Sequence, residues 1–229
     1  MKNIKFPICA ASLFILMSCV DLNLNPLSEG SSENWYSSQA EIEMSLIDFY
    51  RKEFFPIDDM MWGDDVTARN STSAINNGTL TSEDWTIASR WENYYKGIAR
   101  ALRIIKNMDR ARAMGVSEND ITQYEGEAYF YLGYAYGMLA FHWGDAILDK
   151  EGMSLDEAYT ASRSPKADVL AYSYECLDKA AERLPNTYPG IQRATKGAAY
   201  AFKARIAIYN EDYTVAAAAA KSCMDLNVY

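Results

Sequence analysis

Apolar residues recur at intervals of three and four along most of the chain from residue 89 onward, which is the spacing of amphipathic helices. The apolar stripe of the first such helix consists of Trp91, Tyr94, Ile98, Leu102 and Ile105. The pattern Ser89-x-x-Glu92 is that of a capping box and predicts where this helix begins. Gly115 predicts where it ends, because glycine commonly follows the last helical turn.

Further helices are predicted on both sides of this one. Their start signals are Ser117, then Ser164 followed by Pro165, then Thr195, with a last helix beginning near Tyr213. Their apolar faces comprise Ile121, Tyr124, Ala128, Tyr131, Ala135 and Leu139, then Val169, Leu177, Ala181 and Leu184, then Ala198, Ala201, Ala204 and Ile208, and finally the run Ala216–Ala220. A shorter helix is expected from about 39 to 55, because Pro56 ends its apolar pattern.

No segment shows the strict alternation of a strand, so the sequence predicts an all-α fold. The short connections and the alanines at contact positions favour closely packed helical hairpins. The stretch AFKARIAIYNEDYTVAAAAA (201–220) resembles the junction between two helices of a degenerate tetratricopeptide repeat. The chain stops at LNVY without a capping helix, which would leave apolar surface exposed in a helical stack, so we expect the domain to be truncated at its C-terminus.

A long stretch between the first two predicted helices, residues 56–88, has the composition of a loop. It contains Gly63, Gly78 and clusters of Asn, Ser and Thr, residues that favour turns. A loop of this length inside a compact domain is usually functional. We therefore expect residues that bind a ligand in this stretch.

The N-terminus has the layout of an export signal. Lys2 and Lys5 precede an apolar segment, 6–17, that is too short to span a bilayer. Ser18 and Cys19 follow, and this arrangement resembles a bacterial lipobox, in which the cysteine is acylated and becomes the new N-terminus. The alternative is a plain secretory signal with an incidental cysteine.

These features predict three regions of the chain. Residues 1–18 are expected to form a lipoprotein signal peptide, residues 19–38 the lipid anchor and tether, and residues 39–229 the helical domain. The domain is acidic, since the formal net charge of the chain is -9 and loss of the signal peptide removes two lysines. That charge, without any basic run, argues against a nucleic-acid partner.

Cysteine and histidine usage limits the chemistry that can be expected. Cys176 and Cys223 could pair in an oxidising compartment, but each falls in an amphipathic helix, which favours two buried free thiols. His142 is the single histidine and no C-x-x-C motif occurs, so no metal site and no cofactor are predicted. Because His142 sits at a predicted helix C-terminus, we expect it to interact with the helix dipole.

An ordered set of segments resembles the SusD/RagB family of outer-membrane nutrient-binding lipoproteins. The segments are DLNLNP (21–26) after the lipobox, WENYYKGIARALRII (91–105), EAYFYLGYAYGMLAFHWGDAIL (127–148) and RATKGAAYAFKARIAIYNEDYTVAAAAAKSCMDLNVY (193–229). Each segment alone is a weak signal, whereas their order along nearly the whole chain is specific. The chain corresponds to about the N-terminal half of a family member.

The resemblance implies a function as well as a fold. It implies a tetratricopeptide-like scaffold with a long ligand-binding loop, anchored through Cys19 to the outer face of the outer membrane. It implies a binding protein, not an enzyme, that captures an oligosaccharide or sometimes a peptide. The implied partner is a SusC-like, TonB-dependent outer-membrane channel that receives the ligand. A protein-binding scaffold lipoprotein of the same fold remains the alternative.

The loop offers the residue types that sugar binding needs. Trp62, Asp64, Asp65, Arg69 and Asn70 lie close together, and the resemblance implies that this loop contacts the ligand. A tryptophan face covers the C–H surface of a sugar, while carboxylate, guanidinium and amide groups bind its hydroxyls. The alternative is an ordinary loop whose tryptophan packs on the scaffold.

The acidic residues of the same loop allow two other interpretations. Asp58, Asp59, Asp64 and Asp65 could include a pair for glycoside hydrolysis or oxygens for a calcium ion. Spacing along a loop does not determine how far apart two carboxylates lie, and the calcium-loop pattern of an EF-hand is absent. We therefore do not expect hydrolysis, and the sequence leaves calcium binding open.

Overall fold

The computed structural model describes residues 35–56, 63, 74–190 and 192–228. The chain divides into two units, Met1–Trp35 and Tyr36–Tyr229, and only Trp35 of the first unit is described. The predicted signal peptide, Cys19 and most of the tether therefore lie outside the described residues. The second unit carries the helices that follow.

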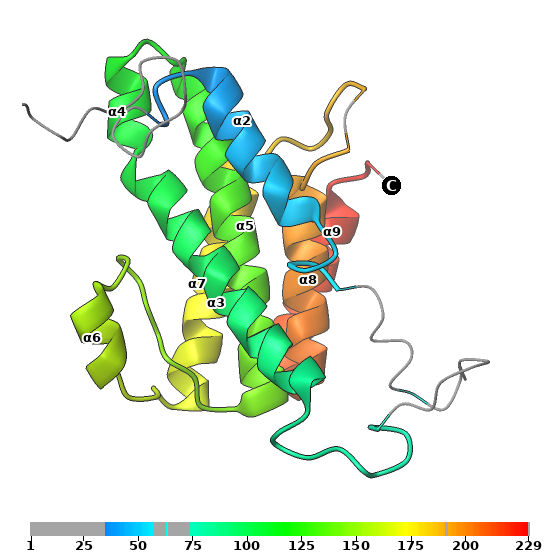
Figure 1. The fold of residues 1–229 in the computed structure, drawn as a ribbon. Helices are drawn as coiled ribbons and strands as arrows, with labels where there is room; N and C mark the ends of the chain where they lie inside the picture. Colours follow the sequence, from blue (N-terminus) through cyan, green and yellow to red (C-terminus); the bar gives the residue numbers. More distant parts are fainter. Residues whose placement is uncertain (1–34, 57–62, 64–73, 191, 229) are drawn as a thin grey trace, which may run out of the picture. The chain divides into compact units, whose positions relative to one another are not determined.

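The regular structure in the described part of the second unit is helical (Figure 1). Its elements are α2 (Gln39–Ile47), the 3-10 helix η1 (Asp48–Tyr50), α3 (Trp85–Lys106), α4 (Met108–Ala113), α5 (Glu118–Trp143), α6 (Leu155–Thr160), α7 (Lys166–Arg183), α8 (Lys196–Tyr209) and α9 (Tyr213–Asp225). Among these residues β pairing is limited to one isolated bridge between Ala146 and Ser164. The expected all-α fold is confirmed.

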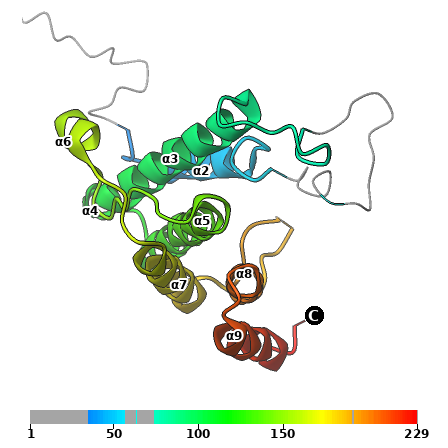
Figure 2. The same ribbon diagram turned by 90° about the horizontal axis from the view of Figure 1, so that it is seen from below.

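Helix α5 is the centre of the packing. It contacts α2, α3, α7 and α8, and α9 in turn packs on α8. Figure 2 shows this order, with α3 on one side of α5, α7 and α8 on the other, and α9 beyond α8. The predicted face of α5 from Ile121 to Leu139 is buried. Between Phe130 and Ala140 the residues on every other side of the helix are buried as well. A helix that is apolar on every side belongs in the middle of a stack.

Glycines in α5 allow its neighbours to approach closely. A Cβ atom at Gly133 would lie 2.5 Å from Cγ of Leu177 in α7. A Cβ atom at Gly137 would lie 2.5 Å from Cδ1 of Ile206 in α8. Both distances are shorter than carbon atoms tolerate, so these glycines set the spacing between α5 and the next two helices.

The start of α3 differs from the prediction. The helix begins at Trp85, capped by Asp84, whose Oδ1 accepts a hydrogen bond of 2.8 Å from the backbone N–H of Thr86. Ser89 lies inside the helix, where its hydroxyl donates to the carbonyl of Thr86. The helix ends at Lys106, and the short α4 separates it from Gly115, which adopts a φ of +92°. A capping pattern is local, so it marks a possible start without excluding an earlier one.

Other boundaries agree with the sequence or move by a few residues. Ser117 and Thr195 cap α5 and α8 as predicted. Helix α7 begins at Lys166, whose backbone N–H donates to Asp145 Oδ1 (2.8 Å), so a residue from the α5 terminus caps it in place of Ser164. Helix α2 ends at Ile47 instead of reaching residue 55, and α6 was not predicted although a capping box begins it.

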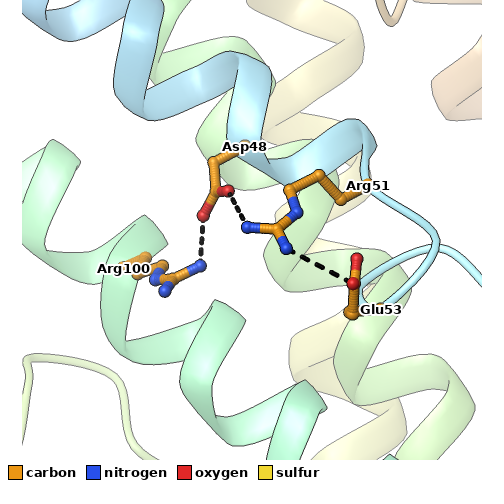
Figure 3. Close-up of polar contacts among 4 residues, drawn as sticks. All are labelled: Asp48, Arg51, Glu53 and Arg100. Atoms are coloured by element: carbon orange, nitrogen blue, oxygen red, sulfur yellow. Dashed lines mark hydrogen bonds and ion pairs between the residues drawn. The ribbon is translucent and has the colours of Figure 1, made fainter.

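Ion pairs attach the segment after α2 to α3 (Figure 3). Asp48 accepts from Arg51 (3.0 Å) and from Arg100 of α3, and Arg51 also contacts Glu53 (3.3 Å). The Arg100 guanidinium lies 4.8 Å from the ring centroid of Phe54, which is buried. The network thereby positions the backbone that leads into the loop following Pro56.

Candidate functional site

The residues predicted to bind a ligand lie outside the described part of the chain. These are Trp62, Asp64, Asp65, Arg69 and Asn70, and their contacts stay predictions. Two contacts involve the described residues of this stretch. The Asn76 side chain donates to the carbonyl of Gly63 (3.2 Å), and the backbone N–H of Thr79 donates to the carbonyl of Ala74 (2.9 Å).

Trp85 is the described residue that best fits a ligand contact at this loop. It is the first residue of α3, directly after the loop, and 76% of its surface is exposed. The Asp84 cap orders the backbone that carries it. Its exposed position on a helix was not predicted, because Ser89 was taken as the helix start and Trp85 was counted as loop. Asp84 was the sequence signal for its position, since aspartate is a preferred N-cap.

Trp91, in contrast, is part of the scaffold. Its ring lies 4.9 Å from Tyr95 and 5.4 Å from Trp143, and the Arg163 guanidinium lies 4.9 Å from its centroid. The Tyr95 hydroxyl donates to the carbonyl of Ile147 (2.9 Å), and burial raises the pKa of Tyr95 to about 12. This aromatic cluster holds the segment after α5 against α3, and its rings contact each other while each stays partly exposed.

A polar cluster around the buried Glu127 joins three distant parts of the chain. Glu127 of α5 is 2% exposed, and its carboxylate contacts Arg193 Nη1 (3.1 Å) and accepts from the Tyr50 hydroxyl (2.8 Å). The Tyr50 oxygen accepts from the backbone N–H of Ala194 (2.9 Å). Burial raises the pKa of the Glu127 carboxyl, and the Arg193 guanidinium opposes that rise. The polar groups of the cluster pair with each other through an ion pair and hydrogen bonds, which fits a structural clamp better than a ligand site.

The remaining candidates are His142 and the cysteines. His142 lies in the last turn of α5, as predicted, between the rings of Phe141 (4.8 Å) and Trp143 (5.5 Å). Both described cysteines are free thiols, Cys176 buried and Cys223 partly exposed. Within the described ranges, no three His, Cys, Asp or Glu side chains come together as metal ligands would. Asp58, Asp59, Asp64 and Asp65 fall outside these ranges.

None of the described helices is both long enough and apolar enough to cross a bilayer.

Two curated proteins of Formosa agariphila resemble the chain. SusD-like protein P2 is 24% identical over 222 residues, which is 90% of this chain and 43% of that protein. SusD-like protein P38 is 24% identical over 241 residues, which is 100% of this chain and 46% of that protein. The chain thus spans less than half the length of these relatives.

Solved structures share the fold. A SusD-like protein from Bacteroides fragilis superposes with a TM-score of 0.72 at 23% identity, over 89% of this chain and 41% of that one. A protein solved with xylogluco-oligosaccharide superposes with a TM-score of 0.58 at 18% identity, over 72% of this chain and 34% of that one. The family model described as "Starch-binding associating with outer membrane" matches residues 33–208. The chain therefore belongs to the SusD-like family that this model defines.

Proposed function

We propose that this chain is the N-terminal part of a surface lipoprotein that captures an oligosaccharide and delivers it to a TonB-dependent outer-membrane transporter. The observation that carries the proposal is the match of residues 33–208 to the family of starch-binding proteins associated with the outer membrane. The structural neighbour solved with xylogluco-oligosaccharide supports a sugar as the ligand class. In this proposal the protein binds its ligand without altering it.

The proposed ligand surface is the loop and the start of α3. Trp85 presents an open ring there, and a sugar could stack on it as on other exposed aromatic platforms. Trp62 would supply a second ring, and the polar side chains Asp64, Asp65, Arg69 and Asn70 would bind hydroxyl groups. A few polar groups beside aromatic rings are what fix the orientation of a small ligand in a binding site.

A binding titration tests this surface directly. Maltooligosaccharides and xylogluco-oligosaccharides are titrated calorimetrically into the purified protein, with Trp62→Ala and Trp85→Ala as variants. Each variant is expected to weaken binding by about tenfold, as losing one aromatic contact does. Tyr159→Ala is the matched control, because Tyr159 is 81% exposed on α6 and outside the proposed surface.

The outcomes separate the proposed function from its alternatives. Oligosaccharide binding that both tryptophan variants leave unchanged would refute the proposed surface. Binding of peptides alone would make the protein a peptide-capture protein. Release of new reducing ends would show an enzyme, and no binding of either class would favour a protein-binding scaffold.

The lipid anchor is a separate proposal with its own test. Acylation of Cys19 would attach the protein to the membrane, and several acyl chains hold far more firmly than one. Cells are labelled with radioactive palmitate, and the label is expected in the wild-type protein but not in Cys19→Ala. Label retained by Cys19→Ala would refute the anchor. Protease accessibility on intact cells then reports whether the protein faces outward.

A further inference from the structure

A group of basic residues lies at the end of α3 and in α4, although the chain as a whole is acidic, with a formal net charge of -9. Residues 100–112 contain a single acidic side chain, Asp109. Their basic side chains are Arg100, Arg103, Lys106, Arg110 and Arg112. These cations are separated by other residues at helical intervals, so they make no run in the sequence but gather on the surface of the folded helices.

Three of the cations follow one line across the junction of α3 and α4. Arg103, Lys106 and Arg110 are spaced by three and four residues, and all three are exposed. Met114, the next residue at this spacing, follows α4 and is 61% exposed. We call these four residues the basic row. Cations that flank an exposed apolar side chain are typical of surfaces that lie on a lipid headgroup layer.

The protein does not use all of these charges itself. Among the residues that the structure describes, Arg103 and Lys106 form no ion pair. Arg112, which lies outside the row, pairs instead with Asp109 (2.5 Å) and Glu118 (2.5 Å). Two acidic groups at this end of the unit are thereby engaged away from the row, which leaves its charges available to a partner.

Glu157 of α6 is close enough to Lys106 to sense its charge. The pKa of Glu157 is lowered mainly by its hydrogen bonds with Ser154, and to a smaller extent by Lys106. Ser154 donates its backbone N–H (2.8 Å) and its hydroxyl (2.7 Å) to the Glu157 carboxylate. This carboxylate therefore caps α6 and does not pair with Lys106.

The chain enters the helical unit beside the basic row. Tyr36, the first residue of this unit, is 7% exposed. Burial raises the pKa of its hydroxyl, and a hydrogen bond with Ser45 and the charges of Arg103 and Arg100 oppose that rise. Figure 1 shows α2 beginning at the end of the unit that carries α4. The basic row is thus close to the point where the predicted tether joins the helices.

We propose that the basic row binds the phosphate-bearing headgroups of anionic lipids and so orients the anchored protein on the membrane surface. Residues 20–35 separate Cys19 from Tyr36, and about 16 residues of chain cannot span more than roughly 55 Å. An anchor at Cys19 would keep the row within this reach of the headgroups, which attract cations over a Debye length of about 8 Å. The acidic remainder of the protein is repelled by the same lipids, so both effects favour one orientation.

This inference rests on the anchor proposed above, and other anionic partners fit the row less well. A nucleic acid would be repelled by the net charge of the whole chain. An anionic sugar needs a concave site that encloses most of the ligand, whereas the basic row follows the outer side of two consecutive helices. A lipid headgroup layer is flat and can contact such a row along its length.

Lysine acetylation reports which side chains the membrane covers. The chain from residue 19 onward is attached by its N-terminus to phosphatidylcholine vesicles with and without phosphatidylglycerol. Attachment uses a hexahistidine tag on a nickel-chelating lipid, so the readout does not require acylation of Cys19. After brief acetylation, mass spectrometry is expected to show Lys106 reacting about threefold or more slowly on the anionic vesicles. Lys166 and Lys221, exposed on α7 and α9, should react equally on both.

Charge reversal tests whether the row itself is responsible. Arg103→Glu/Arg110→Glu should abolish the difference at Lys106 between the two kinds of vesicle. Lys166→Glu/Arg205→Glu is the matched control, because it changes the net charge equally at exposed positions of α7 and α8 and should leave the difference intact. Arg103→Gln removes one charge without reversing it and should give an intermediate effect. Circular dichroism confirms that each variant is folded, and high salt should remove the protection in the unmodified chain.

Four results would overturn the proposal. Equal labelling of Lys106 on both kinds of vesicle would show that the row does not bind headgroups. The same result combined with protection of Lys106 in intact cells would assign the row to an acidic protein partner. Protection that persists in high salt on neutral vesicles would show an apolar contact, and equal protection of Lys221 would show that no orientation is preferred. A negative palmitate experiment would refute the anchor at Cys19 but would leave these readouts unchanged.

Discussion

Arg193 and Glu127, 66 residues apart in the sequence, form a 3.1 Å ion pair inside the helical unit. Each begins one of the segments whose sequence resembles the family, one opening RATKGAA and the other EAYFYLG. Tyr50 completes the contact by donating to the same carboxylate. This contact links the two segments and ties the approach to α8 to the middle of α5.

Removal of the cation from this pair should be costly. Arg193→Met leaves the Glu127 carboxylate buried without its counter-ion, and such changes destabilise proteins by about 3 kcal/mol or more. Urea unfolding of the variant is expected to show this loss in the free energy of unfolding. The double variant Arg193→Met/Glu127→Gln is the control, since it removes the buried charge and should recover part of the loss. A double variant no more stable than the single one would contradict this account.

The destabilisation by Arg193→Met should depend on pH. Burial raises the pKa of Glu127, and removing Arg193 takes away the group that opposes this rise. In the folded variant the Glu127 carboxyl therefore stays protonated at pH values above its ordinary pKa, where the same carboxyl in the unfolded chain has lost its proton. Folding then takes up a proton, so the free energy of unfolding increases as the pH falls. The difference from wild type is expected to be largest at pH 7 and to shrink as the pH approaches about 5. Thermal unfolding across this range measures it, and a pH-independent difference would count against a buried carboxylate.

The close packing at Gly133 gives a third prediction. Gly133→Ala would place a Cβ atom 2.5 Å from Leu177 Cγ and 3.0 Å from the Leu177 backbone nitrogen, so α7 has to shift. We expect a loss of about 2 kcal/mol in urea unfolding, which is typical of overpacking a core. Gly126→Ala is the graded control, because its new Cβ atom meets only side-chain atoms, at 3.0 Å. Equal losses at both positions would show that the α5–α7 spacing is not set at Gly133.

The two tryptophans of α3 should differ in their effect on stability. Trp91→Ala removes a ring packed between Tyr95, Trp143 and Arg163 and is expected to cost about 2 kcal/mol. Trp85→Ala removes an exposed ring and should change stability by less than about 0.5 kcal/mol. Chemical denaturation measures both under the same conditions. If Trp85→Ala proved as destabilising as Trp91→Ala, Trp85 would be part of the scaffold and not of the ligand surface.

Much of the helical architecture could be predicted, because its signals are local or periodic. The predicted face of α5 is buried along its whole length, and Ser117 and Thr195 cap the helices that they precede. Errors arose where two local signals competed or where a capping signal had no apolar pattern behind it. Ser89 resembled a cap, but Asp84 holds the start of α3, and α6 has no buried residue to give it an apolar pattern.

The site shows where prediction from the sequence stops. Of the stretch predicted to be a loop, the described residues 74–84 are non-helical, and the class of the protein could be recognised from the order of its segments. Which aromatic residue is exposed could not, because Trp85 and Trp91 lie in one helix and differ only in what packs on them. The clamp formed by Tyr50, Glu127 and Arg193 was also not predicted, since no periodicity links residues so far apart.

The sequence by itself determined the helical class, the main helix starts and the family, because these depend on spacing within short segments and on the order of those segments. The tertiary structure alone decided which side chains contact each other. It placed Arg193 beside Glu127, packed α7 against Gly133 and left Ile208 and Met224 exposed on α8 and α9. Such contacts depend on how complete helices pack against each other, and burial assigns a side chain to the core or to the surface only after that packing is formed.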